Sequence, residues 1–158
     1  MKDNIIPVDL RKQYLSNMAR YSLYVLFERF VPDVNDGLKP VQRRTLYCML
    51  NDVKCTSKAS KRKSANTVGA VIASYHPHGD TSVYDAMKCL TNWFEIKVPL
   101  INYDSNSGSL QGGPQAAMRY TESYLSKFTM DVIMADLIES KQCVDWSKTF
   151  DNHTEEPM

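Results

Sequence analysis

The sequence has little of what marks a membrane, metal-bound or disulfide-bonded protein. No apolar run reaches the roughly 18 residues of a membrane span, so no membrane association is expected. The first residues lack the charged, apolar and small-residue pattern of a signal peptide, which predicts a cytoplasmic location. Four cysteines occur in 158 residues and none forms a CxxC pair. Free thiols are therefore expected, rather than a structural zinc site.

The overall composition is that of a folded domain. Apolar residues make up 43 % of the chain and charged residues 23 %, which excludes a disordered chain. The net charge of +1 hides an asymmetry, because residues 39–79 carry eight basic side chains and one acidic one. This net +7 predicts a face that binds a polyanion, with a solvated lysine-rich loop as the alternative.

Apolar spacing predicts helices in the first part of the chain. A stripe at intervals of three and four residues predicts a long helix over residues 9–30, ended by Pro32. Shorter stripes predict helices at residues 40–49, 65–75 and 81–94. Asp80 or Thr81 is the expected cap of the last of these.

The second part of the chain begins with a segment of a different kind. Residues 96–118 hold five glycines or prolines, which predicts hairpins and loops. Residues 121–138 are then expected to be helical, with Leu125, Phe128, Val132 and Ala135 facing inward. Residues 145–158 are polar, acidic and without an apolar stripe, which predicts a connection to a further part of the protein.

Together these elements predict an α+β fold of the winged-helix type. The helices at 65–75 and 81–94, joined by a tight turn, resemble a helix-turn-helix pair, and the glycine-rich ribbon after them would be the wing. We expect an N-terminal arm and long helix over residues 1–38, a winged-helix domain over residues 39–142, and the start of a connection over residues 143–158.

The turn between those two helices is the first candidate site. His76, His78 and Asp80 form a His-x-His-x-Asp pattern that could be half of a metal site, as in a metal-dependent phosphohydrolase. The imidazoles could also pair with backbone groups in a structural turn. A third interpretation is that they face a phosphate backbone just before a helix N-terminus, beside the basic stretch.

Two more clusters carry chemistry. A helix starting at Pro40 places Arg43 and Arg44 in its first turns, where guanidinium groups could contact phosphates, although an exposed basic helix is also common. Further on, small residues lead to Arg119 and Tyr120. A tyrosine can be a covalent nucleophile when a cation such as Arg119 stabilises its anion, although most tyrosines only pack.

These clusters, in this order and near this spacing, resemble the A subunits of bacterial type IIA DNA topoisomerases, which are those of gyrase and topoisomerase IV. The resemblance runs from about Met18 to Asp145. The matching segments are residues 31–34, 36–41, 43–44, 75–80, 83–85, 106, 108–109 and 116–122.

The resemblance implies roles for individual residues. Tyr120 matches the nucleophile that forms a 5′-phosphotyrosyl intermediate with DNA, and Arg119 and Arg29 match catalytic arginines. Thr81 and Asp85 match positions that anchor quinolone drugs through a water–magnesium bridge. The DNA-contacting positions are matched by Lys39, Arg43, Arg44, His76 and His78.

The resemblance also implies partners and cofactors. The expected partners are double-stranded DNA and a topoisomerase B subunit in an A2B2 heterotetramer, with a homodimer of the full-length protein and a location at the nucleoid. Mg²⁺ and ATP are expected to be bound by the B subunit, with no metal or cofactor bound by this chain alone. A winged-helix DNA-binding fragment without cleavage activity of its own is the alternative.

Some residues depart from the family pattern. Gln42 stands where the family usually has histidine, and Glu28 replaces a common small residue beside Arg29. The approach to Tyr120 over residues 112–115 often contains Asp and Ser in the family but reads Gly-Gly-Pro-Gln here. The loop is therefore expected to differ in shape, while the nucleophile is retained.

Overall fold

The structure is a computed structural model that describes residues 7–158. The chain divides into two compact units, residues 1–40 and residues 41–158, which we describe separately. The boundaries expected after residues 38 and 142 stay predictions.

A long helix dominates the first unit. Helix α1 (Leu10–Val25) continues into the π-helical turn η1 (Leu26–Phe30), which confirms the predicted helix. The Asp9 carboxylate caps it by accepting the backbone N–H groups of Arg11 and Lys12. No residue of α1 is buried, so the apolar stripe that predicted the helix does not line a core.

A tight turn follows the helix. The Gly37 N–H donates to the Asp33 carbonyl at 2.8 Å, and the Asp33 N–H donates to the Leu38 carbonyl at 2.9 Å. Gly37 has a φ of +70°. This left-handed conformation strains residues with a Cβ, which explains the glycine.

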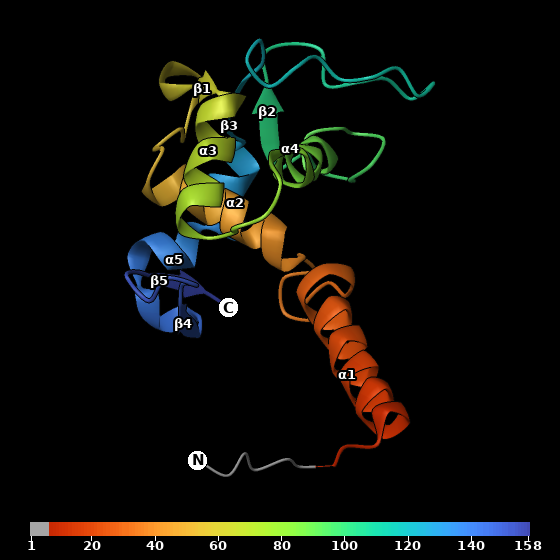
Figure 1. The fold of residues 1–158 in the computed structure, drawn as a ribbon. Coiled ribbons are helices and arrows are strands. Elements are labelled where there is room, and N and C mark those ends of the chain that lie inside the picture. Colours follow the sequence, from red (N-terminus) through yellow and green to blue (C-terminus); the bar gives the residue numbers. More distant parts are fainter. Residues whose placement is uncertain (1–6) are drawn as a thin grey trace. The chain divides into compact units, whose positions relative to one another are not determined.

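The larger part of the second unit consists of three helices of ten residues or more and a three-stranded sheet (Figure 1). Along the chain these are α2 (Pro40–Asn51), the 3₁₀ turn η2 (Lys58–Ser60), β1 (Arg62–Lys63), α3 (Ser64–Ser74), α4 (Asp80–Cys89), β2 (Ile101–Tyr103) and β3 (Glu122–Leu125). The strands form an antiparallel sheet in the order β1-β3-β2. The loop between β2 and β3 reaches away from the sheet (Figure 1).

Short elements complete the unit. They are the π-helical turn η3 (Thr129–Ile133), α5 (Ala135–Glu139), the 3₁₀ turn η4 (Lys141–Cys143), β4 (Trp146–Lys148) and β5 (Glu155–Pro157). Strands β4 and β5 pair as an antiparallel hairpin. The α+β class is therefore confirmed.

The core lies between the three helices and the sheet. Its largest fully buried side chains are those of Leu46, Met49, Val68, Val71, Val83, Met87, Leu90, Ile101 and Leu125. The four cysteines are free, as expected. Burial raises the pKa of the Cys55 thiol to about 11, so this thiol is protonated at neutral pH and is a poor nucleophile.

The helix predicted for residues 121–138 is wrong at its start. Residues 122–125 form strand β3, and burial alternates there, with Thr121, Ser123 and Leu125 inside. Two of these three inward residues carry hydroxyls, which hid the two-residue period of a strand. Phe128 and Val132, expected to face inward, are exposed.

Two further expectations need correction. Helix α4 ends at Cys89 rather than near residue 94, and its N-cap is Gly79 rather than Asp80 or Thr81. After the helix the Leu90 carbonyl accepts the backbone N–H groups of Leu100 and Ile101, which turns the chain toward β2. Within residues 145–158, expected to be an unpatterned connection, the chain forms the β4–β5 hairpin.

The helices of residues 7–158 include none that combines the length and the apolar character needed to cross a membrane.

Leu46→Ala tests the assignment of the core. Leu46 is fully buried, so the substitution is expected to lower the free energy of unfolding by about 2–5 kcal/mol. Urea unfolding followed by circular dichroism measures the change. Leu110→Ala is the matched control, because Leu110 is 70 % exposed and its loss should cost less than about 0.5 kcal/mol. Equal losses for both variants would contradict this core.

Candidate functional site

Tyr120 lies on a turn immediately before β3. The Tyr120 N–H donates to the Ala117 carbonyl at 2.9 Å, which closes the turn. Its side chain is 64 % exposed. The Arg119 guanidinium carbon lies 4.8 Å from the centre of the Tyr120 ring. The predicted pair is therefore adjacent in space as well as in sequence, and the tyrosine is open to a large ligand.

The start of helix α3 holds the backbone of this turn. The Ser64 N–H donates to the Thr121 carbonyl at 3.0 Å, and the Ala65 N–H donates to the Met118 carbonyl at 3.2 Å. These N–H groups lie in the first turn of the helix, where no helical partner exists for them. The helix end is thereby satisfied, and the turn is fixed on both sides of Tyr120.

His76, His78 and Arg44 form a second cluster. The rings of His76 and His78 lie 4.3 Å apart between centroids. Arg44 Nη1 lies 3.3 Å from His76 Nδ1. Because a guanidinium only donates, Nδ1 must accept, which assigns the proton of a neutral His76 to Nε2. The structure thus brings together three residues that the sequence placed in two separate motifs.

A buried carboxylate orients Arg44 from the opposite side. Glu156 of β5 is 4 % exposed. Arg44 donates to it from Nε at 2.9 Å and from Nη2 at 2.8 Å, which is a bidentate ion pair. Sequence analysis missed Glu156, because 112 residues separate it from Arg44 and it lies in a strand that was not predicted.

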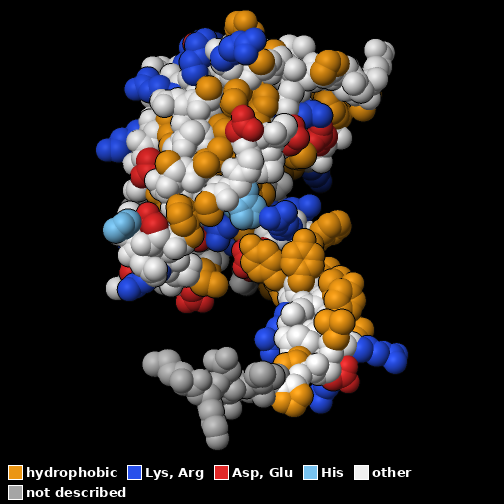
Figure 2. Space-filling view, viewed as in Figure 1, with side chains coloured by type: hydrophobic (Ala, Val, Ile, Leu, Met, Phe, Trp, Pro, Cys, Tyr) orange, Lys and Arg blue, Asp and Glu red, His pale blue; other side chains and the backbone are white. Residues whose placement is uncertain are grey.

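Other basic residues of the stretch 39–79 are also paired. Lys61 contacts Asp104 at 2.8 Å and Glu122 at 2.9 Å, and Lys63 contacts Glu122 at 3.1 Å. Hydrogen bonds from Lys61 and Lys63 lower the pKa of the Glu122 carboxyl. Lys and Arg side chains gather over the β1 end of the unit (Figure 2). The positive face is thus weaker than its net sequence charge suggests.

Helix α4 presents its first residues to solvent. Thr81 and Asp85 are exposed and four residues apart, so they share one face of the helix. Gln115, in the approach to Tyr120, donates from Nε2 to Asp85 Oδ1 at 2.9 Å. The Asp80 carboxylate accepts the Thr81 N–H at 2.8 Å. Of the two predicted drug-contacting positions, Asp85 therefore contacts the approach to Tyr120, and Thr81 lies one helical turn earlier on the same face of α4.

Arg29 and Lys39 belong to the first unit, and their roles stay predictions. Lys39 Nζ lies 5.8 Å from the centre of the Phe30 ring, within the same unit.

No set of three metal-ligating side chains meets within residues 7–158. Asp80 and Asp85 are poorly placed to bind one metal ion together. They are five residues apart on a helix, so their side chains point about 140° away from each other. The hypothesis of a phosphohydrolase using His76, His78 and Asp80 therefore finds no complete ligand set in this part of the chain.

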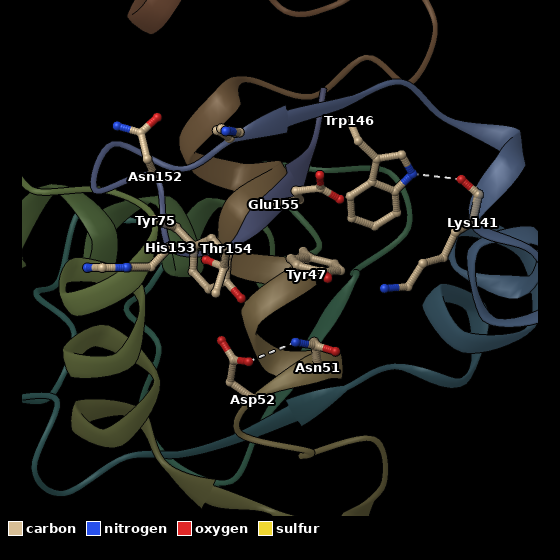
Figure 3. Close-up of a pocket in the computed structure, with 11 residues that line it drawn as sticks. Tyr47, Asn51, Asp52, Tyr75, Lys141, Trp146, Asn152, His153, Thr154 and Glu155 are labelled. Atoms are coloured by element: carbon tan, nitrogen blue, oxygen red, sulfur yellow. Dashed lines mark hydrogen bonds between the residues drawn. The ribbon is translucent and has the colours of Figure 1, made fainter.

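A pocket of about 420 Å³ lies between α2, the end of α3 and the β4–β5 hairpin (Figure 3). Tyr47 makes edge-to-face contacts with Tyr75 and Trp146, each at 5.7 Å between centroids. Burial and the nearby Asp52 carboxylate raise the pKa of the Tyr47 and Tyr75 hydroxyls. Two acids and two lysines line the pocket, so it has no net preference for a charged ligand.

These features define an α+β protein with an exposed tyrosine beside an arginine on an anchored turn. The family of DNA gyrase/topoisomerase IV A subunits matches residues 29–158. The chain belongs to this family.

Individual relatives agree with the family assignment. The chain is 45 % identical over 153 residues to the DNA gyrase A subunit of Deinococcus deserti, which covers 97 % of this chain and 18 % of the relative. It is 44 % identical over 158 residues to the DNA topoisomerase 4 A subunit of Staphylococcus epidermidis, covering 100 % and 19 %. It is 41 % identical over 156 residues to the chloroplastic/mitochondrial DNA gyrase A subunit of Arabidopsis thaliana, covering 99 % and 16 %. The chain thus spans less than a fifth of the length of these relatives.

Glu156→Gln tests the buried ion pair. The substitution keeps the shape of the side chain but removes its charge, so the free energy of unfolding should fall by about 1.5–3 kcal/mol. Chemical denaturation measures the loss. The matched control is Glu155→Gln, one residue earlier on the same strand and exposed, which should change stability by less than about 0.5 kcal/mol. If both variants were equally stable, the pair would not hold Arg44 in solution.

Proposed function

We propose that this chain is the DNA breakage-reunion part of a type IIA topoisomerase A subunit, which in the full complex changes DNA topology with ATP hydrolysis. The observation that carries the proposal is the exposed Tyr120 beside Arg119 on a turn whose backbone is fixed by α3. A nucleophile that must reach a DNA phosphate has to be exposed and yet held in place.

The proposed step is a transesterification. The Tyr120 hydroxyl oxygen attacks a phosphodiester, a bond forms between this oxygen and phosphorus, and the bond to the 3′ oxygen breaks. The tyrosine proton leaves, the 3′ oxygen gains a proton, and the DNA 5′ end stays linked to the protein. Because one phosphate ester replaces another, resealing is the reverse reaction and needs no new high-energy cofactor.

Arg119 is the residue proposed to assist this step. Its positive charge next to the ring would stabilise the tyrosine anion and the charge that develops on the phosphate. Arg29 is proposed as a second catalytic arginine on the basis of the family resemblance alone.

A winged-helix interpretation of the second unit supports this function. The order α2, β1, α3, α4, β2, β3, with the sheet order β1-β3-β2, is compatible with helix-turn-helix helices followed by a two-stranded wing. We propose α4 as the helix that contacts the DNA and the β2–β3 loop as the wing. Thr81 and Asp85 on α4 are proposed as the quinolone-contacting positions.

DNA binding is proposed to use Lys39, Arg43, Arg44, His76 and His78. The ion pair with Glu156 orients Arg44, and Arg44 in turn contacts the ring of His76. Arg44 is therefore proposed both to contact DNA and to position His76. With Nδ1 accepting from Arg44, the N–H donor of a neutral His76 is at Nε2.

The proposed partners follow from the family. They are double-stranded DNA, a B subunit in an A2B2 heterotetramer, and a second copy of the full-length protein, located at the nucleoid in the cytoplasm. Mg²⁺ and ATP are proposed to be bound by the B subunit. A winged-helix DNA-binding fragment without cleavage activity of its own is the second candidate. It is favoured because Asp80 and Asp85, five residues apart on α4, point about 140° away from each other.

Tyr120→Phe tests the nucleophile. The variant should form no covalent DNA adduct but bind DNA within a few fold of the wild type, because only the hydroxyl is lost. The assay incubates the chain, Mg²⁺ and the B subunit with supercoiled DNA, then denatures the sample and detects protein-linked 5′ ends. Tyr124→Phe, on the neighbouring strand, should leave the adduct unchanged, and the chain with Mg²⁺ alone should give none. An adduct formed by Tyr120→Phe contradicts the assignment.

The salt dependence of binding tests the basic face. We expect the logarithm of the affinity to fall with the logarithm of the salt concentration with a slope of several units. Replacing Arg43 and Arg44 together by Ala should reduce this slope by about one to two. Lys127→Ala, in the acidic part of the chain, should leave it unchanged. Fluorescence anisotropy measures the slopes, and an unaltered slope for the double variant would place the DNA elsewhere.

A further inference from the structure

We propose that Tyr84 is a positioning residue that fixes the turn carrying Tyr120 through its buried hydroxyl. This inference rests on the proposed function, since it assigns a task to Tyr84 in the cleavage reaction. Tyr84 lies in α4 and is 7 % exposed.

The Tyr84 hydroxyl contacts the chain on both sides of the turn. It donates to the Ala116 carbonyl at 2.6 Å, before the turn, and lies 3.1 Å from Thr121 Oγ1, after it. Thr121 is fully buried, and its Oγ1 lies 2.7 Å from Ser64 Oγ. A line of hydroxyls thus joins α4, the turn and the start of α3.

The exposure of Tyr120 makes such anchors necessary. Because most of its side chain faces solvent, its position depends on the backbone of residues 116–121. Helix α3 holds this backbone at Met118 and Thr121 through N–H donors. The Tyr84 hydroxyl holds it at Ala116, at the end where the long β2–β3 loop arrives.

A second link from α4 lies next to the first. Asp85 accepts from Gln115 at 2.9 Å, but this contact is exposed to solvent. Water competes for exposed hydrogen bonds, whereas a buried partner left unsatisfied costs its full desolvation. The Tyr84 contacts, partly buried at Ala116 and fully buried at Thr121, should therefore dominate. Because α4 is also the proposed DNA-contacting helix, Tyr84 ties the position of the nucleophile to the helix on which the DNA would rest.

Tyr84→Phe tests this proposal, with Tyr47→Phe as the matched control. Tyr47, on α2, is 6 % exposed, and its ring packs against Tyr75 and Trp146 rather than against the turn. Both variants delete the same atom, but only the first deletes a link to the turn. Each chain is incubated with the B subunit, Mg²⁺ and DNA. The rate of adduct formation in a single turnover and the DNA dissociation constant are both measured, and hydrogen exchange of residues 113–121 is followed on the chain.

For Tyr84→Phe we expect adduct formation about tenfold slower, DNA affinity within twofold of the wild type, and faster exchange of the Ala116 and Tyr120 amides. Tyr47→Phe should match the wild type in adduct rate, DNA affinity and amide exchange. If Tyr84→Phe fails to fold, Thr121→Val decides, because it removes the next hydroxyl in the line and should give the same pattern.

Two results would overturn the proposal, and they are distinguishable. If the wild-type chain forms the adduct but Tyr84→Phe has an unchanged adduct rate or unchanged amide exchange, the role of Tyr84 is refuted. The proposed function then still stands. Absence of an adduct when the wild-type chain is combined with the B subunit would refute the proposed function, and the role of Tyr84 with it.

Discussion

The site depends on hydrogen bonds to a turn of the chain rather than on the packing of its central side chain. Tyr120 is exposed, so the position of its hydroxyl is set by the backbone around it. The start of α3 supplies two N–H donors to this backbone, and α4 supplies the Tyr84 hydroxyl. The core between these helices thus keeps a solvent-exposed group in one place, which is what a reaction with a large polymer requires.

Charge is arranged by contacts between distant parts of the sequence. The basic stretch 39–79 reads as a strong positive face, but Glu122 and Glu156 of the acidic later segment fold back onto Lys61, Lys63 and Arg44. For Arg44 the pairing is partly buried and orients the guanidinium toward His76. The positive charge of the basic stretch is therefore partly neutralised, and its Arg44 side chain is held in one orientation. The net sequence charge overstates the positive potential of this surface.

Much of the fold could be predicted because helices leave a local signal. Helices α1, α2 and α3 follow apolar spacings that are visible within a few residues. Strand β3 could not be predicted, since the buried side chains of Ser123 and of Thr121 just before the strand are not apolar. Pairing with β1 and β2, which are distant in sequence, buries them. The adjacency of Arg119 and Tyr120 follows from sequence order. The roles of Glu156 and Tyr84 depend on partners 112 and 32 residues away, and no local pattern encodes such pairs.

The central claim is that one tyrosine of the nine in this chain becomes covalently attached to DNA. Mass spectrometry tests it most directly. The adduct formed with the B subunit is trapped by denaturation, digested with nuclease and protease, and searched for a peptide that carries a nucleotide on tyrosine. The account predicts this modification on Tyr120 and on no other tyrosine. A nucleotide on another residue, or on none in a sample that contains broken DNA, would contradict it.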